Sequence, residues 1–157
     1  MGRINFVKGI LDYTDDIEDF LDRILNIPAD VQIKMLKAQG EIIAEAEKST
    51  ALTMLQGPYT DVDTGVAQSI KVGKMKKSRA DTMYHTDVIF EGTQHGERLA
   101  TIAFVNEYGA LHAGRGSLNG EPHIQPPRPF VTTAIYQASG DAVEAAHKIF
   151  MDDFINK

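Results

Sequence analysis

The triplet Asp63-Thr64-Gly65 is the arrangement of residues in this chain that most resembles a catalytic motif. In aspartic proteases this triplet carries the catalytic aspartate, and two such carboxylates share one proton. The residues before it, 59–62, do not form the apolar strand that such a loop follows, and Asp61 adds a second negative charge nearby. A turn capped by Asp and Thr is the simpler interpretation, and an aspartic-type hydrolase is kept as an alternative.

Other common chemistries find less support in the sequence. Asp61, Asp63 and Gly65 begin a tolerable calcium loop, but Val72 stands where the bidentate glutamate belongs. The chain has no cysteine, which removes disulfides, thiol catalysis and thiolate metal sites. None of the histidines pairs with a glutamate at metalloprotease spacing on a helix: His85, His95, His112, His123 and His147. We therefore expect no catalytic residue, no cofactor and no metal, and the sequence predicts that the protein is not an enzyme.

Charge is distributed unevenly along a chain whose net charge is -6. An acidic run occupies residues 12–22: Asp12, Asp15, Asp16, Glu18, Asp19 and Asp22. A basic run occupies residues 71–79 and is a candidate interface patch: Lys71, Lys74, Lys76, Lys77 and Arg79. Both runs are typical of solvated surfaces, but complementary patches of this kind also join neighbouring copies. No aromatic residue interleaves the basic run to stack bases, which weakens a nucleic-acid interpretation.

Hydrophobic periodicity predicts three helices. Residues 15–25 form the first, with acids in its opening turn. The second covers about 30–55, with an apolar stripe at every third or fourth position: Val31, Met35, Ala38, Ile42 and Ala46. The last runs from about Pro129 to Ile155, opened by a proline cluster that suits a first turn. Its middle is rich in alanine, which permits close approach of another backbone.

Between these helices the pattern changes to alternation. Ser69–Val72 and Asp87–Phe90 read as strands with one buried face, joined by the lysine-rich segment, and extended structure is expected to begin after Gly65. Residues 100–108 favour a short helix that ends at a left-handed Gly109. Four glycines and four prolines predict a long loop without regular structure at 109–129.

At 157 residues the chain is expected to form one domain, with an acidic helical segment at 12–27 and the Gly/Pro-rich loop at 109–129. No apolar stretch approaches the length of a membrane span, so no membrane partner is expected.

Three motifs taken in order resemble the small neck and tail-completion proteins of long-tailed bacteriophages and prophages. They are the segment from Pro58 through Asp63-Thr64-Gly65 to Ile70, then residues 103–109 with the sequence Ala-Phe-Val-Asn-Glu-Tyr-Gly, then Pro127-Arg128-Pro129-Phe130. They span about residues 58–135, and the flanking long helices also match that family's layout. The loop at 110–125 is longer than the family's usual connection.

The resemblance implies a structural α+β protein, with a small antiparallel sheet packed against the long central helix and the long C-terminal helix. It implies a ring at the junction of capsid and tail, a hexamer or dodecamer through which DNA passes, in contact with neighbouring neck or tail proteins. It places the protein in the virion after assembly in the host cytoplasm. A non-viral adaptor that offers its proline-rich segment to partners is a further alternative.

Within the resemblance, the residues with an assembly or structural role are those of the three motifs: Asp63, Thr64, Gly65, Glu107, Tyr108, Gly109, Arg128, Pro129 and Phe130. Because the second and third motifs flank the long loop, we expect Arg128 to pair with Glu107 and tie its two ends together. We also expect the loop to become ordered against a neighbouring subunit.

Overall fold

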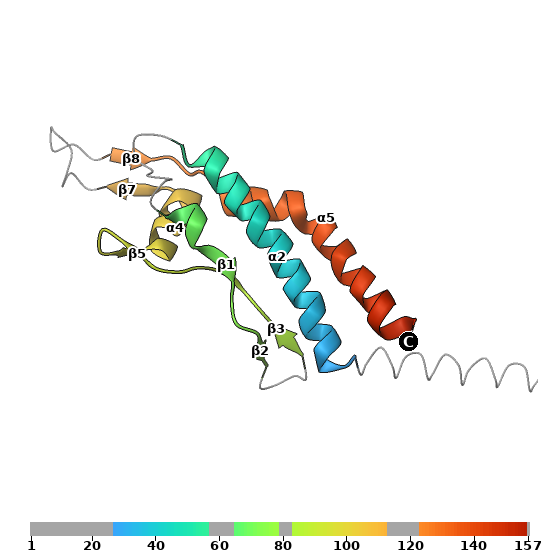
Figure 1. Cartoon of the computed structure of the whole chain (residues 1–157). Coiled ribbons are helices and arrows are strands. Elements are labelled where there is room, and N and C mark those ends of the chain that lie inside the picture. Colours follow the sequence, from blue (N-terminus) through green and yellow to red (C-terminus); the bar gives the residue numbers. More distant parts are fainter. Residues whose placement is uncertain (1–26, 57–64, 79–82, 113–122, 157) are drawn as a thin grey trace, which may run out of the picture.

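Two long helices dominate the computed structural model, which describes residues 27–56, 65–78, 83–112 and 123–156. Helix α2 covers Ala29–Met54, and α5 covers Phe130–Phe150 and continues into the π-helical turn η2, Met151–Ile155. They lie side by side and run in opposite directions, as Figure 1 shows. Lys34, near the start of α2, accordingly pairs with Asp153, just beyond the end of α5.

Small residues line the contact between α2 and α5. On α5 the buried positions recur every fourth residue, which makes one continuous ridge: Phe130, Ala134, Ala138, Ala142 and Ala146. The prediction that the alanine-rich middle admits another backbone is confirmed, and that backbone is α2.

The apolar stripe predicted for α2 is only partly right. Val31 is buried, whereas Met35, Ala38, Ile42 and Ala46 are half-buried. The fully buried positions farther along the helix are these: Gly40, Ala44, Glu47, Thr50 and Ala51. Because α2 packs against α5 and also against the strands, its smallest residues take the closest contacts and its larger apolar residues lie at the edges.

The predicted strands pair as expected, antiparallel and next to α2 (Figure 1). β1, Ile70–Val72, faces β4, Val88–Phe90, with Ile70 opposite Phe90. The hairpin continues into β2, Lys76–Lys77, and β3, Tyr84–His85. Extended structure does not follow Gly65 directly: one helical turn, α3, Val66–Ser69, comes first. Val66, Ala67 and Ser69 are all buried, and a helical turn places them together against the core.

A tight hairpin and a short helix follow β4. Strands β5, Thr93–Gln94, and β6, Glu97–Arg98, are joined by His95 and Gly96, both at positive φ as a two-residue hairpin turn requires. Helix α4 then covers Leu99–Tyr108 and ends at Gly109, whose φ is 76°. The helix predicted at 100–108 and its glycine terminator are confirmed.

The segment 109–129 is not the unbroken loop that its composition predicts. Strand β7, Ala110–His112, pairs antiparallel with β8, His123–Gln125, as a hairpin that leaves the end of α4. The glycines and prolines of the segment fall outside these two strands, at Gly109, within 113–122 and within 126–129, so each three-residue strand is free of both. Composition averaged over 21 residues concealed this separation.

One core holds these elements together. Phe130, Leu55 and Ile70 are its largest fully buried side chains, and Phe130 meets Phe90 edge-on at 6.0 Å between ring centroids. The first residue of α5 is thereby anchored against the sheet, which fixes where that helix begins. The predicted acidic helix, apart from Ile27, and the residues Asp63, Thr64 and Arg79 lie outside the described ranges.

Candidate assembly site

The second and third motifs meet where α4 ends and α5 begins. Glu107 is 6% exposed, and its carboxylate accepts hydrogen bonds from the first turn of α5. The N–H of Val131 bonds to Oε2 at 2.8 Å, and the N–H of Thr132 bonds to Oε1 at 3.0 Å. The hydroxyl of Thr132 donates a third bond to Oε1. Glu107 therefore serves as an N-terminal cap supplied by another helix.

The sequence around Pro129 explains why α5 needs this external cap. A helix begins with unpaired N–H groups, which a Ser, Thr, Asp or Asn normally satisfies. Pro129 occupies that position and offers no side-chain acceptor. A carboxylate also interacts favourably with the positive end of the helix dipole. The expected Glu107–Arg128 ion pair stays a prediction, because the described hydrogen bonds of the Glu107 carboxylate come from Val131 and Thr132.

The two ends of the segment 109–129 are nevertheless tied, through Asn106 and the backbone. The N–H of Arg128 donates to the carbonyl oxygen of Asn106 at 2.6 Å. The amide of Gln125 donates to Oδ1 of Asn106 at 3.1 Å. We call these two hydrogen bonds the Asn106 latch. Gly109 lies so close to it that a Cβ at this position would stand 2.7 Å from the carbonyl oxygen of Gln125. No other residue fits at Gly109, and its positive φ adds a second reason.

A second buried carboxylate, Glu47 of α2, lies beside this junction. It is 3% exposed, and within the described residues its Oε2 has no hydrogen-bond partner. Burial, with a further contribution from the negative charge of Glu107, raises the pKa of Glu47 to about 7. Near neutral pH this side chain is therefore partly protonated, which lowers the repulsion between the two carboxyl groups.

Sequence reasoning missed Glu47 because a glutamate on a long helix usually faces solvent. A signal was present, however. Gly40, Ala44, Glu47 and Ala51 are spaced by four, three and four residues, which is the spacing of one helix face. Glu47 is thus the one charged position in a stripe of small residues.

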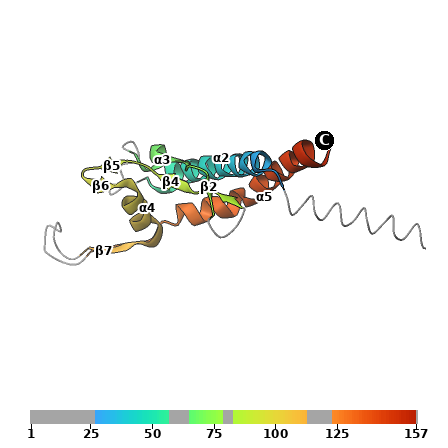
Figure 2. The same cartoon turned by 90° about the horizontal axis from the view of Figure 1, so that it is seen from below.

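The β7–β8 hairpin carries apolar side chains on its outer face. Leu111 and Ile124 lie directly opposite each other and are 69% and 70% exposed. Gln125 contacts Asn106 of α4, so by strand alternation the neighbouring Ile124 points the other way. Figure 2, like Figure 1, shows β7 projecting beyond the helices. At its base Tyr108 and Phe104 are also exposed, with ring centroids 4.8 Å apart.

The basic run forms what we call the lysine hairpin, residues 71–78 with 83–87. Lys71 forms a salt bridge with Glu91, and Nζ of Lys76 lies 3.2 Å from Oδ2 of Asp87. Lys77 lies 5.9 Å from the centre of the Tyr84 ring. Lys74 is exposed. Intramolecular pairing therefore neutralises part of this basic surface, and among the described residues no carboxylate pairs with Lys74 or Lys77.

Gly65, the last residue of the first motif, is buried, and its carbonyl oxygen accepts from the N–H of Ser69 to open α3. The predicted site residues thus divide into three places. Gly65 begins the turn before β1, the second and third motifs form the α4–α5 junction, and the lysines lie on a separate hairpin.

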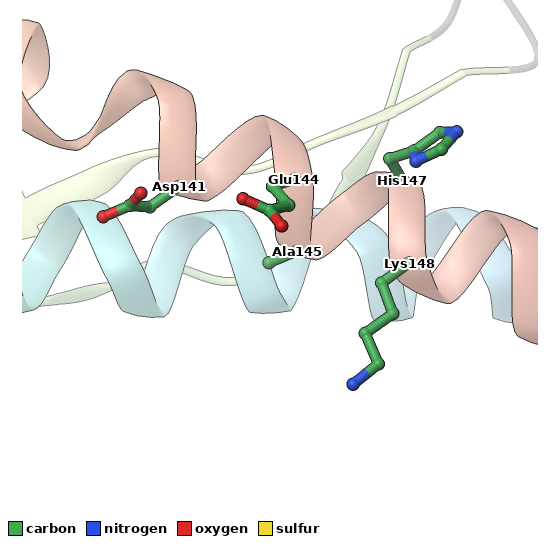
Figure 3. A pocket seen from close by; sticks show the side chains of 5 residues that line it. All are labelled: Asp141, Glu144, Ala145, His147 and Lys148. Atoms are coloured by element: carbon green, nitrogen blue, oxygen red, sulfur yellow. The ribbon is translucent and has the colours of Figure 1, made fainter.

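A shallow pocket lies on the outer side of α5, where Figure 3 shows its lining. The lining side chains all come from one helix, and all but that of Ala145 are exposed: Asp141, Glu144, Ala145, His147 and Lys148. Such a surface does not enclose a small molecule. Over the described ranges, no three metal-ligating side chains gather into a cluster. None of the described helices combines the length and apolar character that crossing a bilayer requires.

Comparison of the chain with protein-family models, with curated proteins and with solved structures finds no match in any of the three.

Proposed function

We propose that this chain is a structural subunit of a long-tailed phage or prophage particle, which assembles with copies of itself into a ring at the joint between capsid and tail. The three motifs and their order support the family, and the described surfaces support assembly. In this role the protein performs no catalysis and binds no cofactor, and its chemistry is that of subunit contact.

The observation that carries the proposal is the projecting β7–β8 hairpin. An isolated two-stranded hairpin is at best marginally stable in water, and one with an exposed Leu–Ile pair gains from being covered. Its base, in contrast, is fixed by the hydrogen bonds to Asn106 and by the closely packed Gly109. A rigidly based arm with an apolar face is suited to contact with a neighbouring subunit.

The fold around the arm fits the same role. Glu107 and Phe130 anchor the start of α5 from two sides, so the junction that carries the arm is coupled to the core. A ring requires that each subunit present its contact surfaces in one orientation. The anchoring of α5 to the core holds the arm in one orientation.

The test is the oligomeric state of the full chain by native mass spectrometry and negative-stain electron microscopy. We expect rings whose mass is a multiple of the 17.3 kDa chain, a hexamer or dodecamer. Deleting residues 112–121 is expected to leave the far-ultraviolet circular dichroism of a folded monomer and to abolish the rings. Rings that persist unchanged after this deletion would contradict the assignment of the arm.

A further inference from the structure

The lysine hairpin lies beside the start of α2, where the described part of the chain begins. Gln32, in the first turns of α2, forms hydrogen bonds with Ile27 before the helix and with Tyr84 of the lysine hairpin. Its amide donates to the carbonyl oxygen of Ile27 at 2.7 Å, and its Oε1 accepts from the N–H of Tyr84 at 3.4 Å. Figure 1 places β2 and β3 beside the start of α2. The 26 residues that precede Ile27 therefore join the molecule next to this basic surface.

Those preceding residues carry the opposite charge. Residues 12–22 contain six carboxylates and no lysine or arginine, while residues 71–79 contain five basic residues and no acid. Lys74 and Lys77 lack a described carboxylate partner. Met83, at the same hairpin, is 69% exposed. The surface thus offers two lysines without a described carboxylate partner beside an apolar side chain, which complements an acidic amphipathic segment.

We propose that the acidic segment 12–25 of one copy docks on the lysine hairpin of the next copy in the ring. The inference rests on the proposed function, because it needs neighbouring copies. A head-to-tail ring requires two different surfaces that complement each other. Every copy carries one acidic segment and one lysine hairpin, so each copy binds one neighbour by its segment and the other by its hairpin.

A head-to-tail ring needs a contact between copies, which docking within one copy would not supply. A mixture of two charge variants distinguishes the two arrangements.

The experiment uses full-length chains with reversed charges. The hairpin variant carries Lys74→Glu and Lys77→Glu, and the segment variant carries Asp15→Lys, Asp19→Lys and Asp22→Lys. Each variant alone is expected to assemble at least about tenfold more weakly than the unmodified chain, because like charges then meet at the contact. A matched control, Lys37→Glu with Lys148→Glu, makes the same charge change elsewhere and is expected to assemble normally.

Mixing the two variants shows whether the acidic segment docks on a neighbouring copy or within its own copy. In a 1:1 mixture every contact regains opposite charges, so alternating rings are expected to form with restored affinity, measured by mass photometry and native mass spectrometry. Restoration only when both sets of changes are placed in one chain would show docking within a copy and overturn the proposal. Rings unaffected by either variant would overturn it and leave the proposed function standing. Absence of any oligomer in the unmodified chain would overturn both.

Discussion

The Glu107 carboxylate does the work that a local capping side chain does in most helices. It satisfies two N–H groups of α5 and one hydroxyl, all of them in a partly buried setting. Glu107→Ala leaves these donors without an acceptor, and hydrogen bonds to a charged group contribute about 1.5–3 kcal/mol each. We expect the free energy of unfolding to fall by about 2–4 kcal/mol in urea titrations. A loss below about 0.5 kcal/mol would show that water replaces the carboxylate at little cost.

Glu47 gives the protein a pH-dependent stability. Its folded-state pKa of about 7 lies above the ordinary value of 4.5, so the folded chain holds this proton over a range in which the unfolded chain has lost it. The stabilising contribution is complete below about pH 4.5 and disappears as the pH rises through about 7. A shift of this size corresponds to about 3 kcal/mol.

Glu47→Gln removes this titration and tests its origin. The variant is expected to gain about 2–3 kcal/mol relative to the unmodified chain between pH 5 and pH 8, because the amide carries no charge at either pH. The comparison is made by urea unfolding at both values. Glu45→Gln, on an exposed neighbouring position of α2, serves as the control and is expected to show no such gain. Parallel pH profiles for the unmodified chain and Glu47→Gln would be inconsistent with a buried, raised-pKa carboxyl.

At the scale of elements, sequence predicted the helices well and the short elements unevenly. Helices α2, α4 and α5 were predicted because periodicity accumulates over several residues. Strands β1 and β4 have only three residues each but were predicted from the alternation of apolar and polar residues. Strands β7 and β8 are equally short and were missed because they lie in a segment rich in glycine and proline, and the four residues of α3 are too few to show a helical period. The cap on α5 was also invisible locally, because its acceptor lies 24 residues upstream of the Val131 N–H to which it bonds.

Replacing the glycine in the middle of each long helix by alanine is expected to change the free energy of unfolding in opposite directions. A Cβ at Gly140 of α5 would meet nothing within 4 Å, whereas a Cβ at Gly40 of α2 would lie 2.9 Å from Cγ1 of Val72. Gly140→Ala is therefore expected to raise the free energy of unfolding by about 0.8–1 kcal/mol through helix propensity alone. Gly40→Ala gains the same propensity but forces Val72 away, and we expect a net loss of about 1–2 kcal/mol. Denaturant melts of both variants check the signs, and equal gains would show that α2 and β1 pack loosely.

At the scale of the whole molecule, sequence predicted the class of fold but not which faces meet. The α+β arrangement of two long helices and small antiparallel sheets is observed, yet in the described part of the chain the strands form four separate two-stranded pairs rather than one sheet. The face that α2 presents to α5 depends on the alanine ridge of α5, which no property of the α2 sequence alone reveals. The pairing of Glu107 with the start of α5 likewise depends on how α4 is placed by the core.

Substitutions of the exposed apolar pair on the β7–β8 hairpin are expected to affect assembly without affecting folding. Leu111 and Ile124 bury little surface within the chain, so Leu111→Ser with Ile124→Ser is expected to change the free energy of unfolding by less than about 0.5 kcal/mol. If the hairpin is covered by a neighbour, the same change removes apolar area worth about 1.5–3 kcal/mol per side chain from each contact. Sedimentation velocity is then expected to show rings replaced by monomers.

The control for this pair is Leu52→Ser with Ile89→Ser, which removes the same two residue types from other exposed positions, 50% and 36% accessible. We expect these changes to leave assembly intact, since Leu52 lies on α2 and Ile89 on β4, away from the projecting arm. Equal loss of rings in both variants would mean that general surface hydrophobicity drives association. Loss in the hairpin variant alone would assign the contact to the arm.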